Sequence, residues 1–356
     1  MVRTNHTRQI IAEDGRAAAS ACAEALELLD GKSILITGAT GFVGGSIVDA
    51  LLAFNTQTRT PCRLLLTTRS VDTAKKMRPD LVGVPGVRWI EWREGSPIAD
   101  VAAPCEYLIH AAAPTSASAI AVNPFASAQQ MTALTAQVVE WARRHHVRSM
   151  LFLSSGAVYG RPPEKLQTIP ESYAGAPDPV ASESAYGEAK RYCELLCSTS
   201  GVPFTVARLF ACFGPRQALE SGFAIPDFFR QLLGNGRIEV AGDGEARRAF
   251  GYITDVVAAL LKLLLRGDSG PQVCNVGADT PVVSIAELAR LVAHIWGGAD
   301  VFICGNSGDA LRPRYVPDIS KMKNLHRPQV GLEAGLLRMV ESLRASRTMN
   351  SGGSRA

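Results

Sequence analysis

The chain has 356 residues, of which 47% are hydrophobic and 20% charged, and its formal net charge is +4. This length is enough for one large α/β domain or for a domain with a smaller lobe, and the composition is ordinary for a soluble globular protein. No run of lysine and arginine indicates a nucleic-acid surface, no apolar run is long enough to span a membrane, and the N-terminal stretch has no signal-peptide apolar region.

The eight cysteines are scattered and form neither a CxxC pair nor a Cys/His cluster. Cys193 and Cys197 are four residues apart on a predicted helix, and two core thiols on one helix face explain this spacing better than a metal does. The sequence therefore predicts no metal site and a reduced, cytoplasmic compartment, with no nucleic-acid or membrane partner.

From Lys32 onward, short apolar runs alternate with longer helical patterns, which is typical of a doubly wound parallel sheet. Runs that are apolar throughout indicate strands covered on both faces. Before this region we expect a mobile start and then a helix near residues 17–29. The predicted strands are Ser33–Thr37, Arg63–Thr67, Val87–Glu91, Tyr107–Ala111, Ser149–Ser154 and Phe204–Leu209, and the predicted helices are Phe42–Phe54, Ala126–His145 and Ser184–Ser200.

After Gly214 the pattern changes to helical segments separated by Gly-rich turns, which predicts a smaller C-terminal lobe. Elements of this half can return to the sheet, so the sequence gives no clean boundary. The expected organisation is an N-terminal extension with a helix (1–31), a dinucleotide-binding domain (32–214), a mainly substrate-binding lobe interleaved with it (215–345) and a flexible tail (346–356).

The stretch "TGATGFVGG" places glycines between the first predicted strand and the first long helix. Glycine allows a tight turn and close approach of the backbone to a pyrophosphate, and the following helix directs free N–H groups at that anion. In this strand–turn–helix context the pattern predicts a Rossmann-type dinucleotide site. The predicted cofactor contacts are Gly38, Gly41, Phe42, Val43 and Gly44.

The end of the second predicted strand, "RLLLTTRSVD", bears on the choice between NAD and NADP. An acid at the strand tip would bind the ribose hydroxyls of NAD, but Arg69 and Ser70 stand there and Asp72 comes later. Arg69 can pair with a 2′-phosphate, which favours NADP over NAD. A solvated loop arginine is the alternative.

Tyr186 and Lys190 in "ESAYGEAKRYCELL" are four residues apart on a predicted helix, so both side chains lie on one face. An ammonium group near a phenol favours the phenolate and suits the phenol for proton transfer. Ser155, at the end of an earlier predicted strand, can hold a substrate oxygen. Together with the glycine loop, these three residues predict a catalytic set.

These motifs resemble those of the extended short-chain dehydrogenases/reductases, in particular the nucleotide-sugar epimerase/dehydratase group. The resemblance covers roughly Lys32 to Leu343. It is carried by "TGATGFVG", "HAAAPTS", "SSGAVYG" and "YGEAK", and in the C-terminal half by "RRAFGYITDVV", "CNVG" and "RPRYVPDISK".

The resemblance implies a role for each matching residue. Tyr186 would be the general acid/base on a sugar hydroxyl or ketone, Lys190 would bind the nicotinamide ribose and tune Tyr186, and Ser155 would hydrogen-bond the reacting oxygen. The remaining matches are Ala111, Ala112 and Ala113, which would line the cofactor, and Arg248, with Arg312 or Arg314, which would bind the diphosphate of a nucleotide sugar.

The same resemblance implies a homodimer in which the helices 126–145 and 184–200 of each subunit form a four-helix bundle. Three differences affect fine contacts with cofactor and substrate. Met131 and Ala211 stand where the family commonly has Asn, and "WREGSP" lacks the usual Asp-apolar pair.

Gly156 and Ala157 stand where dehydratases of this group carry an Asp-Glu pair and decarboxylases a Glu. Neither residue can transfer a proton, whereas reversible oxidation at C4 needs only Ser155, Tyr186, Lys190 and the nicotinamide. An NAD(P)-dependent sugar 4-epimerase is therefore the leading hypothesis, and elimination or decarboxylation ranks lower.

Two alternatives stay open. An NADPH-dependent reductase of a 4-keto nucleotide sugar or another carbonyl compound would consume reduced cofactor steadily, and Arg69 supports it. A non-catalytic dinucleotide-binding sensor is the alternative from another class. The joint presence of Ser155, Tyr186 and Lys190 argues against such a sensor.

Overall fold

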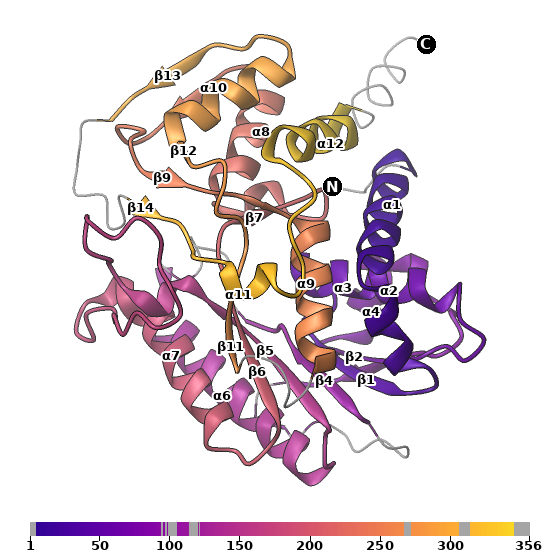
Figure 1. The fold of residues 1–356 in the computed structure, drawn as a ribbon. Coiled ribbons are helices and arrows are strands. Elements are labelled where there is room, and N and C mark those ends of the chain that lie inside the picture. The colour runs from indigo at the N-terminus through magenta and orange to yellow at the C-terminus, as the bar shows by residue number, and fades with distance from the viewer. Residues whose placement is uncertain are drawn as a thin grey trace.

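A seven-stranded parallel sheet forms the centre of the computed structural model, which describes residues 5–93, 95–96, 98, 105–113, 120, 122–266, 272–305 and 314–344. Its order is β11-β6-β5-β4-β1-β2-β3, so the chain leaves β1 toward one edge and returns through β4 toward the other (Figure 1). The strands are β1 (Ser33–Thr37), β2 (Arg63–Thr68), β3 (Val87–Glu91), β4 (Tyr107–His110), β5 (Ser149–Ser155), β6 (Phe204–Leu209) and β11 (Val273–Val276).

Helices cover both faces of this sheet, which explains why β1 and β4 are buried along their whole length. On β1, Ile34 and Ile36 pack with residues of α3 and α9, whereas Leu35 packs with residues of α6 and α7. The helices of this part of the chain are α3 (Phe42–Asn55), α4 (Val71–Met77), α6 (Pro124–Arg144), α7 (Ala185–Ser198) and α9 (Ile253–Arg266), with short 3-10 turns η2 (Pro79–Leu81), η3 (Gly156–Tyr159) and η4 (Ser182–Ser184).

The predicted α/β fold class is confirmed. The six predicted strands agree with the observed ones to within one residue at each end, and the three long helices agree to within two. The apolar runs are short and bounded by polar or turn residues, which distinguishes strands covered on both faces from the longer helices.

The N-terminal helix begins earlier than predicted. The structure has α1 (Asn5–Ala21), then α2 (Ala23–Leu26) and η1 (Glu27–Leu29), where the sequence predicted one helix near residues 17–29. Gly15 lies inside α1 because a Cβ there would stand 2.9 Å from the carbonyl oxygen of Asp49 on α3. The glycine weakens the local helix signal and permits the close packing of α1 on α3.

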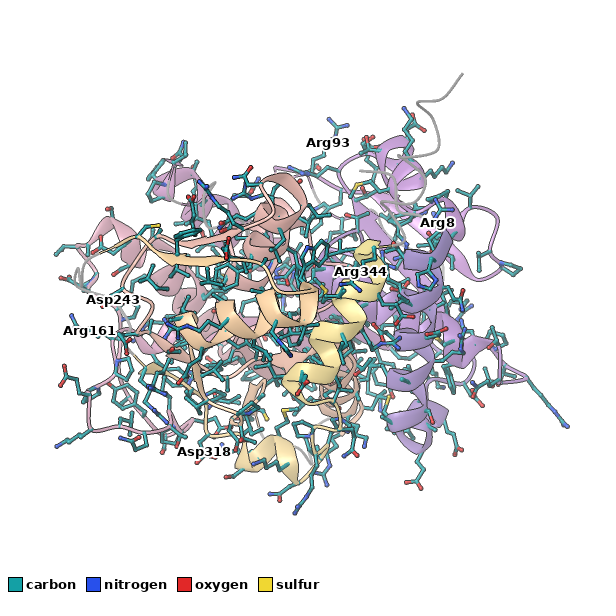
Figure 2. The ribbon with its side chains drawn as sticks, turned by 90° about the horizontal axis from the view of Figure 1, so that it is seen from above. Arg8, Arg93, Arg161, Asp243, Asp318 and Arg344 are labelled. Carbon is teal, nitrogen blue, oxygen red and sulfur yellow. The ribbon has the colours of Figure 1, made fainter. Side chains whose placement is uncertain are left out.

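The C-terminal half contributes β11 to the central sheet and α9 to one of its faces. Its other elements form a group of helices and small sheets (Figure 1). Seen from above, α12 lies beside α1, near the labelled Arg344 and Arg8 (Figure 2). The helices of this half are η5 (Leu219–Ser221), α8 (Ala224–Gly234), α10 (Ile285–Trp296), α11 (Ser320–Lys323) and α12 (Leu332–Arg344). The small sheets pair β7 (Cys212–Phe213) with β10 (Gly251–Tyr252), β8 (Ile238–Val240) with β13 (Val301–Ile303), and β9 (Arg247–Arg248) with both β12 (Val283–Ser284) and β14 (Arg314–Tyr315).

None of the described helices combines the length and the apolar character that crossing a membrane requires. The predicted tail, 346–356, lies outside the described residues.

Candidate active site

The glycine loop packs closely against the segment that follows β4. Gly38 has a φ of +72°, and a Cβ on it would stand 2.8 Å from the backbone of Ala111 and Ala112. A Cβ on Gly44 would collide with the carbonyl oxygen of Gly38. Both glycines are therefore required by close backbone approach, as expected for a dinucleotide loop.

The N-terminus of α3 fits the pyrophosphate of a dinucleotide. Gly41 is its N-cap residue in an extended conformation, and no side chain caps the helix. The first N–H groups of α3, which include those of Phe42 and Val43, therefore point out of the helix without a capping side chain. This loop and the adjacent Ala111–Ala113 segment are the residues that would hold NAD(P).

A buried hydrogen-bond chain that the sequence did not reveal fixes these two loops. The Thr37 hydroxyl accepts from the N–H groups of Ala111 (3.1 Å) and Ala112 (3.0 Å) and lies 2.7 Å from Nδ1 of His110. Nε2 of His110 lies 3.0 Å from the Thr135 hydroxyl, which donates to the carbonyl of Met131. The two accepted N–H groups leave Thr37 as the donor to Nδ1, so the proton of His110 resides on Nε2.

His110 stays neutral in this chain. Burial lowers the pKa of its ring to about 3, and the Lys190 ammonium adds to the effect. The sequence assigned a role to the alanines of "HAAAPTS", whereas the histidine of this motif and Thr37 are the residues that hold the loop. Only the tertiary contact between β1 and β4 shows this role.

Arg69 lies exposed just beyond the carboxyl end of β2. Ser70 next to it caps α4 by accepting from the backbone N–H of Thr73. No carboxylate occupies the strand tip, since Asp72 belongs to the first turn of α4. Arg69 therefore follows β2 directly, as the sequence predicts, and its pairing with a 2′-phosphate stays a prediction.

The three predicted catalytic residues come from β5 and α7, which pack against each other. Ser155 ends the strand, and the buried Lys190 of α7 donates from Nζ to the carbonyl of Leu153 (2.7 Å). The same Nζ lies 6.0 Å from the ring centroid of Tyr186. Gly187 lets α7 approach the turn after Ser155, because a Cβ there would stand 2.8 Å from the Ala157 carbonyl oxygen.

The Lys190 ammonium is less stable than it would be in water. Burial lowers its pKa to about 8, while Cys193, Cys197 and Glu194 act in the opposite direction. Nζ also lies 4.8 Å from the ring centroid of Phe152, where a cation is favoured. Lys190 therefore keeps its charge near neutral pH and loses it in mildly alkaline solution.

The Ser155 hydroxyl is held in place by the backbone. Its Oγ accepts from the N–H of Ala157 at 3.1 Å, so its own proton can be donated to another acceptor. Gly156 contacts Tyr315, whose hydroxyl and ring end lie where a Cβ on residue 156 would stand. The two residues after Ser155 thus contribute no titratable side chain.

The predicted substrate arginines come together only in part. β14 pairs with β9 so that Tyr315 lies opposite Arg248, and the Arg248 guanidinium lies 5.5 Å from the Tyr315 ring centroid. Arg314, on the same strand as Tyr315, donates from Nε to the carbonyl of Gln167 (2.7 Å). Arg312 lies outside the described residues.

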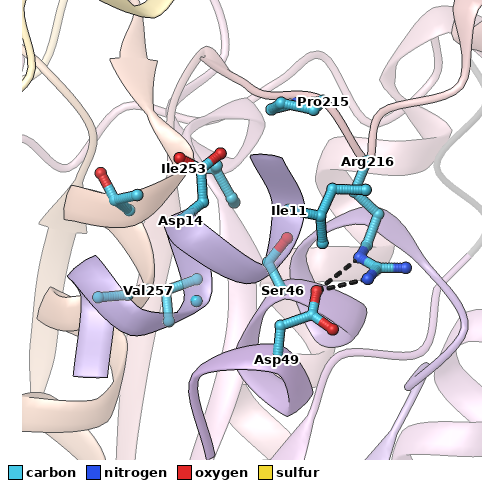
Figure 3. A pocket seen from close by; sticks show the side chains of 11 residues that line it. Ile11, Asp14, Ser46, Asp49, Pro215, Arg216, Ile253 and Val257 are labelled. Atoms are coloured by element: carbon cyan, nitrogen blue, oxygen red, sulfur yellow. Dashed lines mark hydrogen bonds and ion pairs between the residues drawn. The ribbon is translucent and has the colours of Figure 1, made fainter. Parts of the chain in front are cut away.

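The pocket in Figure 3 lies away from this centre. It is bordered by α1, α3 and α9 and by Arg216, which binds Asp49 of α3 through Nε at 2.8 Å. None of the predicted site residues lines it. In the part of the chain that the structure describes, no group of three His, Cys, Asp or Glu residues is arranged to hold a metal ion.

Comparison with known proteins identifies the family. Residues 34–277 match the model of the NAD dependent epimerase/dehydratase family. The chain belongs to this family. The predicted relationship to extended short-chain dehydrogenases/reductases and the predicted NAD(P)-dependent enzyme class are thereby confirmed.

Two curated relatives align with most of this chain. UDP-glucuronic acid decarboxylase 1 of Xenopus tropicalis is 31% identical over 327 residues, covering 88% of this chain and 73% of the relative. UDP-glucuronic acid decarboxylase 5 of Arabidopsis thaliana is 30% identical over 318 residues, covering 87% of this chain and 89% of the relative.

Solved structures share the fold. A UDP-glucose 4-epimerase from Thermotoga maritima aligns with a TM-score of 0.72 at 23% identity, over 88% of this chain and 99% of that one. A UDP-glucuronic acid 4-epimerase from Bacillus cereus aligns with a TM-score of 0.73 at 19% identity, over 88% and 99%.

Proposed function

We propose that this protein is an NAD(P)-dependent enzyme that oxidises a nucleotide-diphosphate sugar at C4 and returns the hydride, which makes it a sugar 4-epimerase. The buried Lys190, which lies beside the Tyr186 ring and donates to the carbonyl of Leu153 two residues before Ser155, carries this proposal. Open α/β sheets bind their ligands at the carboxyl ends of their strands, and Ser155 ends β5. The names of the relatives and of the solved neighbours support a nucleotide sugar as substrate.

The residues of the chain divide the proton work among themselves. The Lys190 ammonium favours the phenolate of Tyr186, which takes the proton of the C4 hydroxyl as the hydride leaves and, now a phenol, returns that proton when the hydride comes back. The Ser155 hydroxyl donates a hydrogen bond to the reacting oxygen and so holds it in line. Bound NAD(P) supplies the acceptor for the C4 hydride, and Arg248 and Arg314 bind the diphosphate.

The absence of acid/base side chains at Gly156 and Ala157 supports epimerisation. Elimination of water across C5 and C6 needs a base and an acid beside Ser155, and neither residue can serve. An epimerase needs only that the 4-keto sugar turns its other face to the reduced cofactor.

Decarboxylation is the second candidate, because the curated relatives are UDP-glucuronic acid decarboxylases. Oxidation at C4 of a uronic acid gives a β-keto acid, which can lose CO₂ without a base. The enolate that remains then takes a proton at C5. The absence of carboxylates at Gly156 and Ala157 makes the protonation at C5 slower but does not prevent the loss of CO₂.

The reaction can be identified by incubating the purified protein with sugar nucleotides, UDP-glucuronic acid and UDP-glucose among them, and analysing the products by NMR. The proposal expects a 4-epimer and no net absorbance change near about 340 nm. A pentose product with release of CO₂ would assign a decarboxylase. Steady oxidation of NADPH would assign the 4-keto reductase that the sequence left open.

Tyr186→Phe serves as the control in the same assay. It removes the proton acceptor but keeps the ring, so product formation should fall by about two orders of magnitude or more. Full activity in this variant would refute the catalytic role of Tyr186. NADP as the preferred nucleotide, a homodimer and a cytoplasmic location complete the proposal.

A further inference from the structure

Asn275 of β11, whose side chain is completely buried, joins segments that lie far apart in the sequence. Its Oδ1 accepts from the Tyr159 hydroxyl (2.8 Å), and its Nδ2 donates to the carbonyls of Ile169 (2.8 Å) and Asp318 (3.1 Å). Its backbone N–H donates to the Glu171 carboxylate (2.9 Å). Losing a partner in such a buried site leaves a polar group without its hydrogen bond, so each of these contacts holds its segment firmly.

The first of these contacts reaches the catalytic turn. Tyr159 ends η3, the turn that follows Ser155. Its ring lies 4.7 Å from the guanidinium of Arg208, which binds the Glu194 carboxylate at 3.0 and 2.6 Å, and Glu194 accepts from the Ser154 hydroxyl at 2.5 Å. Ser155 thus lies between two residues, Ser154 and Tyr159, whose side chains belong to one network.

The phenol of Tyr159 is a donor at every physiological pH. Burial raises its pKa to about 12, although the Arg208 guanidinium opposes the shift. The hydrogen bond from Tyr159 to Asn275 therefore stays intact while Tyr186 changes its protonation state.

The other contacts reach the segment that carries a substrate arginine. The N–H of Ile169 donates to the carbonyl of Val316, and the N–H of Asp318 donates to the carbonyl of Ile169, both at 2.9 Å. This paired segment continues from β14, where Arg314 lies. By donating to Ile169 and Asp318 at once, Asn275 fixes the position of that segment relative to β11.

We propose that Asn275 is a positioning residue that holds the Ser155 turn and the Arg314 segment in a fixed relation. The reacting carbon of a nucleotide sugar then lies at Ser155 when its diphosphate lies at Arg314. The inference rests on the proposed function for the identity of the substrate, and on the contacts alone for the coupling.

Two near-isosteric variants separate the two halves of this coupling. Asn275→Asp keeps the acceptor for Tyr159 but removes both donors toward Ile169 and Asp318, whereas Tyr159→Phe removes the hydroxyl that donates to Asn275 and keeps both amide donors. We expect Asn275→Asp to raise the Kd of UDP, used as a probe in calorimetry, and the KM of the sugar nucleotide about tenfold. Tyr159→Phe should lower kcat about tenfold and leave UDP binding unchanged.

Ser149→Ala is the matched control, because Ser149 is buried and donates to the Leu264 carbonyl at 2.8 Å from the opposite end of β5. It should lower the melting temperature without changing KM, kcat or UDP binding. If Asn275→Asp and Tyr159→Phe behave like this control, Asn275 only stabilises the fold and the inference is wrong.

Hydrogen exchange tests the coupling independently of any substrate. Peptides that cover residues 165–173 and 314–320 should exchange faster in Asn275→Asp than in the wild type and in Ser149→Ala. Equal exchange in all three proteins would overturn the inference. A wild-type protein that converts no sugar nucleotide would refute the proposed function, while the exchange experiment would still decide the role of Asn275.

Discussion

The Lys190 ammonium should set the alkaline limit of activity. Burial lowers its pKa to about 8, and above this pH the uncharged amine no longer favours the phenolate of Tyr186. We expect kcat to fall with an apparent pKa near 8 when the rate is measured from pH 6 to pH 10. An activity that stays constant to pH 10 would contradict the role assigned to Lys190.

The loss of activity at alkaline pH can be distinguished from unfolding, because the contribution of Lys190 to stability changes with pH in the opposite direction. The pKa of Lys190 is lower in the folded protein than its ordinary value of 10.5, so the unfolded chain binds more protons between about 8 and 10.5. The contribution of this group to stability therefore increases with pH across that interval. Lys190→Met should reduce kcat by about two orders of magnitude and abolish the alkaline decline.

Arg69 should decide the nucleotide preference. Its exposed guanidinium follows β2 directly, and a bidentate pair with a 2′-phosphate would favour NADP. Arg69→Ala should raise the Kd of NADP at least about tenfold and leave that of NAD unchanged, as measured by calorimetry. Arg63→Ala, at the opposite end of the same strand, should change neither. If Arg69→Ala leaves both affinities unchanged, the NADP prediction is wrong.

For single residues, the sequence predicts those whose spacing places them on one face of a helix or at the end of a strand. Tyr186 and Lys190 are recognisable because a four-residue spacing places them on one helix face, and in the structure Lys190 lies beside the Tyr186 ring and bonds the carbonyl of Leu153. His110 and Asn275 could not be assigned a role, because their partners come from other strands. A hydrogen bond between distant segments leaves no periodic signal in the sequence.

Among the elements, α1 shows how tertiary contacts override local preference. Its buried Asp14 accepts from the hydroxyl of Tyr252, the residue before α9, at 2.7 Å. It also accepts from Nε of Arg338 on α12 at 2.8 Å. The carboxylate interrupts the apolar face that would otherwise predict the helix, and Gly15 follows it directly. The helix exists because both residues have partners on other elements.

The buried Asp14 should therefore be worth more to stability than its neighbour Glu13. Asp14→Ala leaves the Tyr252 hydroxyl and the Arg338 guanidinium without their carboxylate, and we expect the free energy of unfolding to fall by about 3 kcal/mol. Glu13→Ala removes an exposed carboxylate 3.3 Å from Arg338 and should cost at most about 0.5 kcal/mol. Urea denaturation of both variants measures the difference, and equal losses would contradict this account.

For the molecule as a whole, six of the seven strands of the central sheet are predictable, but β11 and the division into domains are not. β11 comes after α8, the short strands β8, β9 and β10, and α9 in sequence and still completes the sheet beside β6. Its four residues, VCNV, are too short and too mixed to be distinguished from a loop strand. A strand of this kind is specified by the open edge that β6 offers rather than by its own pattern.

The outer face of α6 and α7 should be the surface on which two copies of the molecule associate. The two helices lie side by side on one face of the sheet (Figure 1), with Lys190 and Cys193 of α7 directed inward. Phe125 at the start of α6 and Tyr192 and Leu195 on α7 are exposed large apolar side chains. Burying them in a four-helix bundle removes apolar surface from water.

Replacing this surface with charge should therefore separate the subunits. We expect the wild type to be a dimer in size-exclusion chromatography with light scattering and Tyr192→Lys/Leu195→Lys to be a monomer, because two ammonium groups per subunit would face each other across the bundle. Leu337→Lys, which charges an exposed leucine on α12, should remain a dimer. Both substitutions leave Ser155, Tyr186 and Lys190 in place, so a monomeric variant should still bind its cofactor. A monomeric wild type, or a double variant that stays dimeric, would exclude α6 and α7 as the interface.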